Sequence, residues 1–288
     1  DWVLHEECLV GLFESSIVDS NLRSCITGGA STASLSWTDF NYYSAQRKLQ
    51  QIDYEMHKHI ANLFYVRYGR RDSQAQCGAG SHSYTRITGG TAAYGMRDTI
   101  GFDAAKEIDP SLTASLVDNL NPQFSWYPST DGESITQVNN SCCLGYEDIY
   151  GDKREMMDGV SLPNDSGNVY KWLITMPDGS QRKVKGSSRS DMWITAIAHG
   201  KYMDVIPVGT TSGSYSTHYC DYFWVSGSAG RVVYRGYSYA SANGGVAITY
   251  AYYDSSSSHA CIGSRLAFRG QIVKAASVSA YKALSEIA

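Results

Sequence analysis

The chain lacks the marks of several functional classes. Its 288 residues include no run of eighteen apolar residues, so we expect no membrane insertion. The 24 basic side chains are fewer than the 28 acidic ones, and the net charge of −4 argues against nucleic acid as a partner, because nucleic-acid-binding proteins carry a basic excess. Charged residues are scarce, at 18% against about 25% in ordinary soluble domains, whereas apolar residues reach 43%. The chain can therefore bury a core.

Motifs for common catalytic sites are also missing. The chain has no Gly-x-Ser-x-Gly elbow of a serine hydrolase, and no Glu-Pro-Asn or Gln-Pro-Asp tripeptide of a calcium-dependent sugar site. The glycines at 227–230 and 243–245 lack the strand-to-helix context of a phosphate loop. Glu155 and Asp158 are candidate paired carboxylates, but we expect them to be structural partners of backbone or arginine groups. We therefore predict no catalytic residue and no cofactor.

Metal-binding patterns are equally weak. His57 and His59 lie two residues apart on a predicted helix and so point about 200° apart, and we expect both in solvent rather than on a metal. Cysteine is present seven times, an odd number, with no Cys-x-x-Cys spacing for a zinc site. We expect mostly buried free thiols, with one disulfide bridge left open, among Cys8, Cys25, Cys77, Cys142, Cys143, Cys220 and Cys261.

Two helices are predicted in the first quarter of the chain. Gly69 is a stop signal directly after the segment 52–68. A weaker helix runs from about residue 38 to 49, with Ser36 or Thr38 as its N-cap. The longer helix is predicted because apolar residues recur there at the helical period, at Ile52, Met56, Ile60, Leu63 and Phe64.

Strand signals follow in the second half. Residues 171–176 and 181–185 flank the turn formers Pro177, Asp178 and Gly179, which predicts a hairpin. Helices first and short antiparallel strands later, without βαβ alternation, predict an α+β fold. Turn-forming Gly, Asn and Ser residues separate three further predicted strands, at 231–235, 246–253 and 264–269.

The remaining segments complete the expected organisation. The Gly-, Ser- and Thr-rich stretch 70–145 predicts long ordered loops with a short helix near 111–119. The Ala-rich tail 271–288 predicts a helix. We expect a single domain over residues 1–270, followed by this tail.

Residues 204–270, called the biased segment below, have an unusual composition. These 67 residues contain no Lys, Glu, Gln or Met, although the four types make up 35 of the 288 residues. Nine of the 22 tyrosines fall within residues 215–253. Tyrosine gives a large contact area at low entropic cost, and Lys and Glu are depleted at interface cores. The composition is typical of a binding surface, with a Tyr-rich antiparallel sheet as the alternative.

The genetic code favours interpreting the biased segment as a binding surface rather than as an ordinary Tyr-rich sheet. An Asn codon whose two adenines are replaced reaches Tyr, Ser, Asp, His, Cys, Gly, Thr, Ala and Phe, but never Lys, Glu, Gln, Met or Trp. A segment diversified by adenine-directed mutagenesis would contain the reachable residue types and lack the unreachable ones. Trp224 is of an unreachable type and would have to be template-encoded.

Five motifs occur along the chain in a familiar order. Their sequences are LSWTDF at 35–40, YE opening and YG closing 54–69, IYGDKREMMD at 149–158, RVVYRG at 231–236 and IGSRLAFR at 262–269. Together they resemble the formylglycine-generating-enzyme-like subclass of C-type lectin folds. The last two resemble the bracket around the variable region in variable proteins of diversity-generating retroelements, notably those of phages and prophages of gut Bacteroides-type bacteria.

The resemblance implies a non-enzymatic protein whose stable scaffold displays diversified residues on one exposed face. In phage members this face recognises a host-surface receptor from a tail-fibre tip, often as a trimer. For this chain it implies a variable region at about 215–262, a protein or glycan receptor on a host or bacterial cell surface, and a place on a virion tail tip or an extracellular cell surface. Arg235, Arg265 and Phe268 would belong to the scaffold. The displayed residues would be Tyr222, Phe223, Trp224, Tyr237, Tyr239, Ser241, Thr249, Tyr252, Tyr253, Asp254, Ser257 and His259.

Strand alternation sharpens this hypothesis. Tyr237 and Tyr239 would share one strand face, as would Tyr250 with Tyr252 or Thr249 with Ala251. We expect these side chains, together with Phe223 and Trp224, to form one exposed patch.

Two other functions stay open. A cell-surface or pilus-tip adhesin would use the same display face. A copper-dependent formylglycine-generating oxidase would need a pair of cysteines close to the last strands. Cys220 and Cys261 are the late cysteines, and they do not have the Cys-x-x-x-x-Cys spacing of that family.

Overall fold

The computed structural model describes most of the chain outside the stretch 80–145. The helices expected near 111–119 and over 271–288 lie outside the described residues, apart from Ser111, Ser277 and Ser279. Tyr239, one of the expected display residues, also lies outside them. The described residues are 8–11, 14–24, 32, 34–79, 107–111, 124–128, 135–139, 142–144, 146–147, 149–151, 153–163, 169–188, 191–226, 230–237, 241–270, 277 and 279.

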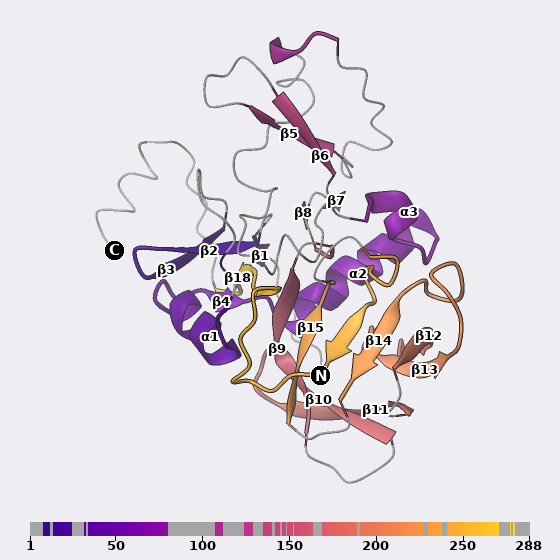
Figure 1. Cartoon of the computed structure of the whole chain (residues 1–288). Coiled ribbons are helices and arrows are strands. Elements are labelled where there is room, and N and C mark those ends of the chain that lie inside the picture. The colour runs from indigo at the N-terminus through magenta and orange to yellow at the C-terminus, as the bar shows by residue number, and fades with distance from the viewer. Residues whose placement is uncertain are drawn as a thin grey trace.

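Nine of the described strands form one sheet at the centre of the fold (Figure 1). The strands are β9 (Arg154–Leu162), β10 (Val169–Thr175), β11 (Gln181–Ser188), β12 (Met192–Ile197), β13 (Pro207–Thr211), β14 (Tyr222–Val225), β15 (Arg231–Arg235), β16 (Thr249–Ala251) and β17 (Ile262–Gly263). Their order is β11-β10-β9-β15-β16-β14-β12-β13, and β17 pairs with β9. Most neighbours are antiparallel, but β14 with β16 and β17 with β9 are parallel pairs.

Smaller sheets surround this centre. One joins distant parts of the chain, because β18 (Leu266–Phe268) lies between β1 (Leu9–Val10) and β4 (Gln50–Gln51). Three two-stranded sheets complete the described strands: β2 (Ser15–Val18) with β3 (Asn21–Ser24), β5 (Phe124–Pro128) with β6 (Ile135–Asn139), and β7 (Cys142–Cys143) with β8 (Tyr146–Glu147). The mixture of a few helices with mainly antiparallel strands confirms the α+β prediction.

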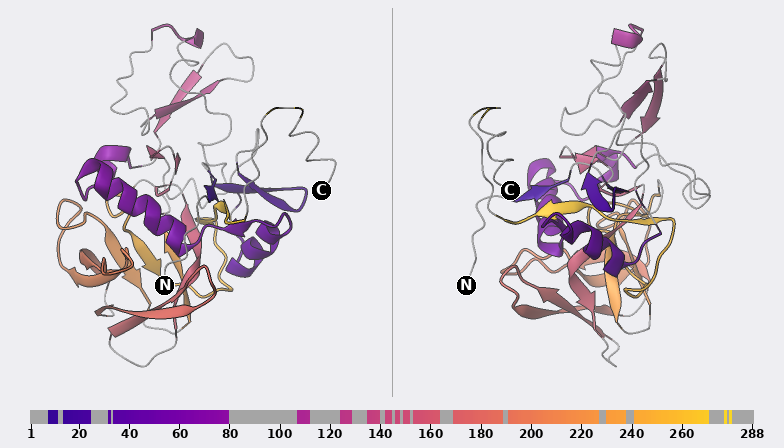
Figure 2. Two further views of the ribbon diagram at one scale, coloured as in Figure 1. Left: turned by 180° about the vertical axis from the view of Figure 1, so that it is seen from behind. Right: turned by 90° about the vertical axis from the view of Figure 1, so that its left-hand side faces the viewer.

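Both predicted helices are present, but the first ends at Ala45 rather than near residue 49, and the second begins at Tyr54 rather than at residue 52. α1 (Trp37–Ala45) starts at Ser36, whose side chain accepts from the backbone N–H of Asp39 while the Asp39 carboxylate accepts from the backbone of Ser36. α2 (Tyr54–Tyr68) ends at Gly69, which adopts the left-handed conformation at φ 60°. A short third helix, α3, spans Gln74–Cys77. Seen from behind in Figure 2, α2 lies across one face of the central sheet.

Two expectations for α2 are wrong. His57 is only 1% exposed, because the sheet covers the side of the helix that carries it. Burial, with Arg235 and Arg265 nearby, lowers the pKa of His57 well below its ordinary value, so the ring is neutral. Leu63 is 58% exposed and lies outside the buried stripe, which is therefore narrower than the periodicity predicts. His59 is exposed, as expected.

The central sheet packs on both faces. Val233 of β15 belongs to the core shared with Ile60 and Phe64 of α2. Its neighbour Tyr234 points to the opposite face and packs in a second cluster with Phe40 of α1. Val233 and Tyr234 point in opposite directions because successive side chains of a strand lie on opposite faces of the sheet.

A buried ion pair ties β9 to the end of the described domain. The Arg265 guanidinium donates from Nε to Oε1 of Glu155 at 2.6 Å, and both side chains are completely buried. Nη1 of Arg265 also donates to the carbonyl oxygen of Gly11 at 2.8 Å. Glu155 is therefore the partner of an arginine, as expected, and the pair links three distant parts of the chain.

Two composition-based expectations concern cysteines and membranes. Within the described residues Cys8, Cys77, Cys143, Cys220 and Cys261 are free thiols, and three of these five are buried, as expected. None of the helices in the described part of the chain is long and apolar enough to span a membrane.

Removal of Arg265 tests the weight of the buried pair. We expect Arg265→Leu to lower the free energy of unfolding by about 3–5 kcal/mol, because it leaves Glu155 buried without its partner. Arg23→Leu is the control: its pair with Asp19 is exposed, with 3.7 Å between the charged atoms, and should cost less than about 1 kcal/mol. Urea unfolding followed by circular dichroism measures both, and equal losses would contradict the assignment.

Candidate binding surface

Strand β14 sends its side chains alternately into the core and toward solvent. Tyr222 and Trp224 are half-buried, whereas Phe223 and Val225 are buried. Phe223 is 0% exposed and packs against Trp172, with 5.8 Å between the ring centroids. The expectation that Phe223 is displayed is therefore wrong, because the period of the strand places it on the core side.

Eight aromatic rings contact one another in succession on the side of the sheet that carries Tyr222 and Trp224, and we call them the aromatic cluster. Two of them, Tyr234 and Tyr250, form its buried base, at 0% and 7% exposed. Trp224 lies at its centre, with ring centroids 4.4 Å from Tyr222, 4.9 Å from Tyr237 and 5.8 Å from Tyr250. Tyr252 is the most exposed member, at 46%. The members are Trp193, Tyr222, Trp224, Tyr234, Tyr237, Tyr250, Tyr252 and Tyr253.

The register of three strands brings these rings together. Trp224 of β14 is paired with Tyr250 of β16, and Tyr250 is paired with Tyr234 of β15. Tyr253 then folds back over both tyrosines, with centroids 5.6 Å from Tyr250 and 6.2 Å from Tyr234. Tilted and edge-to-face contacts of this kind stabilise by about 0.5–1.5 kcal/mol each beyond the area they bury. The sequence left two pairs open for an exposed face, and neither is exposed as a pair: Tyr250 is only 7% exposed beside the exposed Tyr252, and Thr249 and Ala251 are both buried.

The buried guanidinium of Arg154 packs against the inner side of the aromatic cluster. The Arg154 guanidinium lies 4.3 Å from the ring centroid of Tyr250 and 5.4 Å from that of Tyr237. Its Nη1 donates to Sγ of Cys261 at 2.9 Å, and Nδ1 of His259 lies 2.9 Å from the same sulfur. Burial raises the pKa of Tyr234 and Tyr250, so their hydroxyl groups stay neutral at physiological pH.

The loop that enters β16 is fixed by buried polar groups. Nη1 of Arg235 donates to the carbonyl oxygens of Ala247 and Ile248, each at 2.8 Å, and to Oγ1 of Thr249 at 2.7 Å. Thr249 is only 1% exposed for this reason, so its expected display is also wrong. A Cβ atom at Gly245 would lie 1.9 Å from Oδ1 of Asp221, which leaves glycine as the residue that fits there.

The remaining expected display residues lie beside the cluster. Ser241 is half-buried in the loop before β16. Asp254 accepts at Oδ1 from the hydroxyl groups of Ser256 and Ser257, and these bonds lower its pKa. Asp254, Ser257 and His259 therefore belong to a hydrogen-bonded loop after Tyr253. Tyr222, Trp224, Tyr237, Tyr252 and Tyr253 are the expected residues that the structure brings into the cluster itself.

Two residues of this region were missed by the sequence analysis. Trp193 contacts Tyr222 from β12 at 5.3 Å between centroids, and lies outside the biased segment. Arg154 comes from β9 and is buried beneath the cluster. Strand pairing brings both to the cluster, and no local pattern reveals it.

The two late cysteines have different surroundings. Cys261 is buried beside Arg154 and His259, whereas Cys220 is half-buried near Asp72 and Asp221. Burial, followed by these carboxylates, raises the pKa of Cys220 to about 11. In the part of the chain that the structure describes, no group of three or more His, Cys, Asp or Glu side chains is placed to hold a metal ion.

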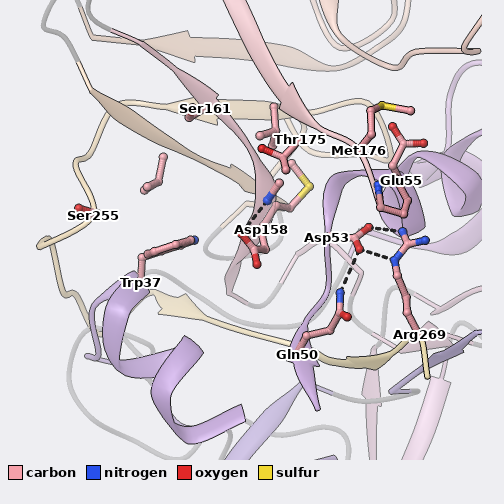
Figure 3. A pocket seen from close by; sticks show the side chains of 15 residues that line it. Trp37, Gln50, Asp53, Glu55, Asp158, Ser161, Thr175, Met176, Ser255 and Arg269 are labelled. Carbon is pink, nitrogen blue, oxygen red and sulfur yellow. Dashed lines mark hydrogen bonds and ion pairs between the residues drawn. The ribbon is translucent and has the colours of Figure 1, made fainter. Parts of the chain in front are cut away.

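A separate cleft of about 420 Å³ lies beside β9 (Figure 3). It is bordered by the starts of α1 and α2 and by the turn between β10 and β11. Asp53 pairs there with Arg269 through two bonds of 2.6 Å. The sequence analysis did not predict this cleft. Trp37, Asp53, Asp158, Thr175, Met176 and Arg269 are among its lining residues.

Comparison with known proteins adds no relative. No protein-family model matches the chain, and no curated protein matches its sequence. A functional assignment therefore rests on the residue pattern and on the geometry described above.

The free energy of unfolding of two variants distinguishes a buried aromatic residue from an exposed one. We expect Phe223→Ala to lower the free energy of unfolding by about 3–5 kcal/mol, because it opens a cavity beside Trp172. Tyr252→Ala should cost less than about 1 kcal/mol, because half of that side chain already meets solvent. Urea denaturation measures both variants, and a loss at Tyr252 as large as that at Phe223 would show that the cluster is interior packing.

Asp221 gives a prediction with a defined pH dependence. Burial raises its pKa well above the ordinary value, and Oδ1 has no hydrogen-bond partner among the described residues. Because the folded pKa is the higher one, the unfolded chain releases this proton first, and stability falls as the pH rises above about 4. Asn does not ionise and keeps an oxygen for the N–H of Ala247, so we expect Asp221→Asn to be more stable at pH 7 by about 1–3 kcal/mol.

The difference between Asp221→Asn and the natural protein should shrink as the pH is lowered toward 4. Asp19→Asn, at an exposed turn, serves as the control and should change stability little at any pH. Thermal unfolding across this range measures the effect, and a difference that grows on acidification would refute the assignment.

Proposed function

We propose that this chain is a non-enzymatic receptor-binding protein that contacts its ligand through the aromatic cluster. One observation carries the proposal: the biased segment supplies seven of the eight rings, all except Trp193, and these rings meet on one face of the central sheet. The alternate residues of the same strands, such as Phe223, are in the core. A segment can change its outward side chains without losing its fold when its inward side chains are kept.

The chemistry of the cluster suits a protein–ligand interface. Tyrosine and tryptophan rings give a large contact area and have few torsions to freeze on binding. The hydroxyl and indole N–H groups provide hydrogen bonds, and the absence of Lys and Glu from the segment removes side chains that are costly to desolvate. The buried Arg154 holds the rings of Tyr237 and Tyr250 in place, so fewer side-chain torsions have to be fixed when a ligand binds.

The scaffold belongs to the same proposal. We infer a C-type lectin fold of the formylglycine-generating-enzyme type, with diversification of the biased segment by a retroelement. The buried positions of Arg235 and Arg265, in the two motifs that bracket this segment, support a structural role for the bracket. In this proposal the receptor is a protein or glycan on a host or bacterial cell surface, and the chain is displayed at a phage tail tip or on a cell surface, with a homotrimer as the assembly that the family resemblance suggests.

Binding to bacterial surface fractions tests the function. We expect Trp224→Ala and Tyr252→Ala each to weaken binding by about 2 kcal/mol or more, roughly thirtyfold in Kd, because central aromatic residues dominate such interfaces. The measurement is biolayer interferometry on fractions treated with protease or with periodate, which also separates protein from glycan receptors.

Tyr42→Ala is the matched control for this experiment. Tyr42 is an exposed tyrosine on α1, at 60%, and lies outside the biased segment. Binding should be unchanged in this variant. Equal binding by the cluster variants and the natural protein, or an equal loss at Tyr42, would refute the proposed surface.

A further inference from the structure

The cleft beside β9 contains a carboxylate that strand geometry aims into it. Val232 of β15 pairs with Ser161, but the next residue, Val233, pairs with Met157. Residues 158–160 therefore form a bulge opposite a continuous strand. Bulges commonly redirect a side chain near a functional site.

The bulge has a definite structural cause. Gly159 adopts φ +72°, and a Cβ atom there would lie 3.3 Å from the carbonyl oxygen of Thr175. The backbone N–H of Asp158 donates to the carbonyl oxygen of Ile52 at 3.0 Å, which fastens the bulge to the segment before α2. As a result, the Asp158 side chain leaves the sheet and enters the cleft (Figure 3).

The other charged groups of the cleft are already paired. Asp53 holds Arg269 through two bonds of 2.6 Å and also caps α2 at the backbone N–H of Met56. Glu55 is ion-paired with Lys58 and with Arg182. The carboxylate oxygens of these two residues are therefore engaged by protein cations.

Asp158 differs from these two carboxylates. Its Oδ1 accepts from the N–H of Gly159 at 2.7 Å, and no basic side chain of the described residues lies within ion-pair distance. Burial, with Asp53 nearby, raises the pKa of Asp158, as expected for a carboxylate without a positive partner. The cleft therefore has an unbalanced negative charge at this point.

An aromatic ring lies across the cleft from this charge. The Trp37 side chain points toward Asp158 (Figure 3). Organic cations are recognised by a carboxylate together with a nearby aromatic ring whose face the cation can reach. Apolar groups and hydroxyl groups complete the wall, from Val160, Ser161, Thr175, Met176, Pro177 and Ser255.

We propose that this cleft binds a small organic amine, with the ammonium group between the Asp158 carboxylate and the Trp37 ring and a short apolar body against Val160 and Met176. The volume of about 420 Å³ suits a small molecule, since ligand pockets span about 300–1,000 Å³. A divalent metal ion would need several oxygen ligands, and Asp53 and Glu55 are occupied by arginine and lysine. The site is separate from the aromatic cluster and does not depend on the proposed receptor.

The test compares two ligands of the same shape and different charge. 2-Phenylethylamine carries the ammonium group, and 2-phenylethanol replaces it with a neutral hydroxyl. We expect the natural protein to bind the amine at least tenfold more tightly than the alcohol, measured by calorimetry or by ligand-observed NMR. Equal binding of the two compounds, or no binding of the amine at millimolar concentration, would overturn the proposal.

Three variants test whether the amine binds at Asp158 and Trp37. Asp158→Asn keeps an oxygen for the N–H of Gly159 but loses the charge, and should remove the preference for the amine. Trp37→Leu should weaken binding of the amine more than binding of the alcohol. Asp178→Asn is the matched control, because Asp178 is an exposed carboxylate in the adjacent turn with a similar bond to the N–H of Ser180, at 2.9 Å. An unchanged preference in Asp158→Asn, or an equal loss in Asp178→Asn, would place the amine elsewhere.

Discussion

The two-residue period of the central strands sends neighbouring side chains to opposite faces of the sheet, where they pack in two different clusters. Phe223, Val233 and Thr249 point to the side covered by α2, where they pack or hydrogen-bond in the interior. Trp224, Tyr234 and Tyr250 point to the other side and form the centre of the aromatic cluster. On β14 the neighbours also differ in exposure, so a change at Tyr222 or Trp224 leaves the buried contacts of Phe223 and Val225 in place. On β16, and on β15 after Arg231, the neighbours on both faces are buried.

Strand β9 connects the features that matter for function. Within five residues it supplies Arg154 to the aromatic cluster, Glu155 to the buried pair with Arg265, and Asp158 to the cleft. The strand is central in the sheet and is paired on both sides, by β10 and β15. Both candidate sites are therefore built on a rigid element, which holds their geometry before any ligand arrives and lowers the entropic cost of binding.

Local signals predicted the local structure well. The N-cap at Ser36, the helix end at Gly69 and the hairpin around Pro177 and Gly179 are all present, because each depends on residues close in sequence. Strand β9 escaped prediction, since its buried Arg154 and Glu155 break the apolar pattern and find their partners more than a hundred residues away. The same limit hid Trp193 and the bulge at Asp158, which arise from strand pairing. The Tyr-rich composition of the biased segment does not distinguish the half-buried Tyr222 from the buried Tyr234, and alternation within β14 was the available signal that would have excluded Phe223.

The position of β18 has a consequence for how the protein is made. This strand lies between β1 and β4, so residues 266–268 close a sheet whose other members are synthesised among the first fifty-one residues. Contacts this distant in sequence are slow to form, because the intervening chain must first be brought together. Strands β1 and β4 therefore stay unpaired in this sheet until residues 266–268 have been synthesised, and a nascent polypeptide that terminates before them has open strand edges at which chains can aggregate.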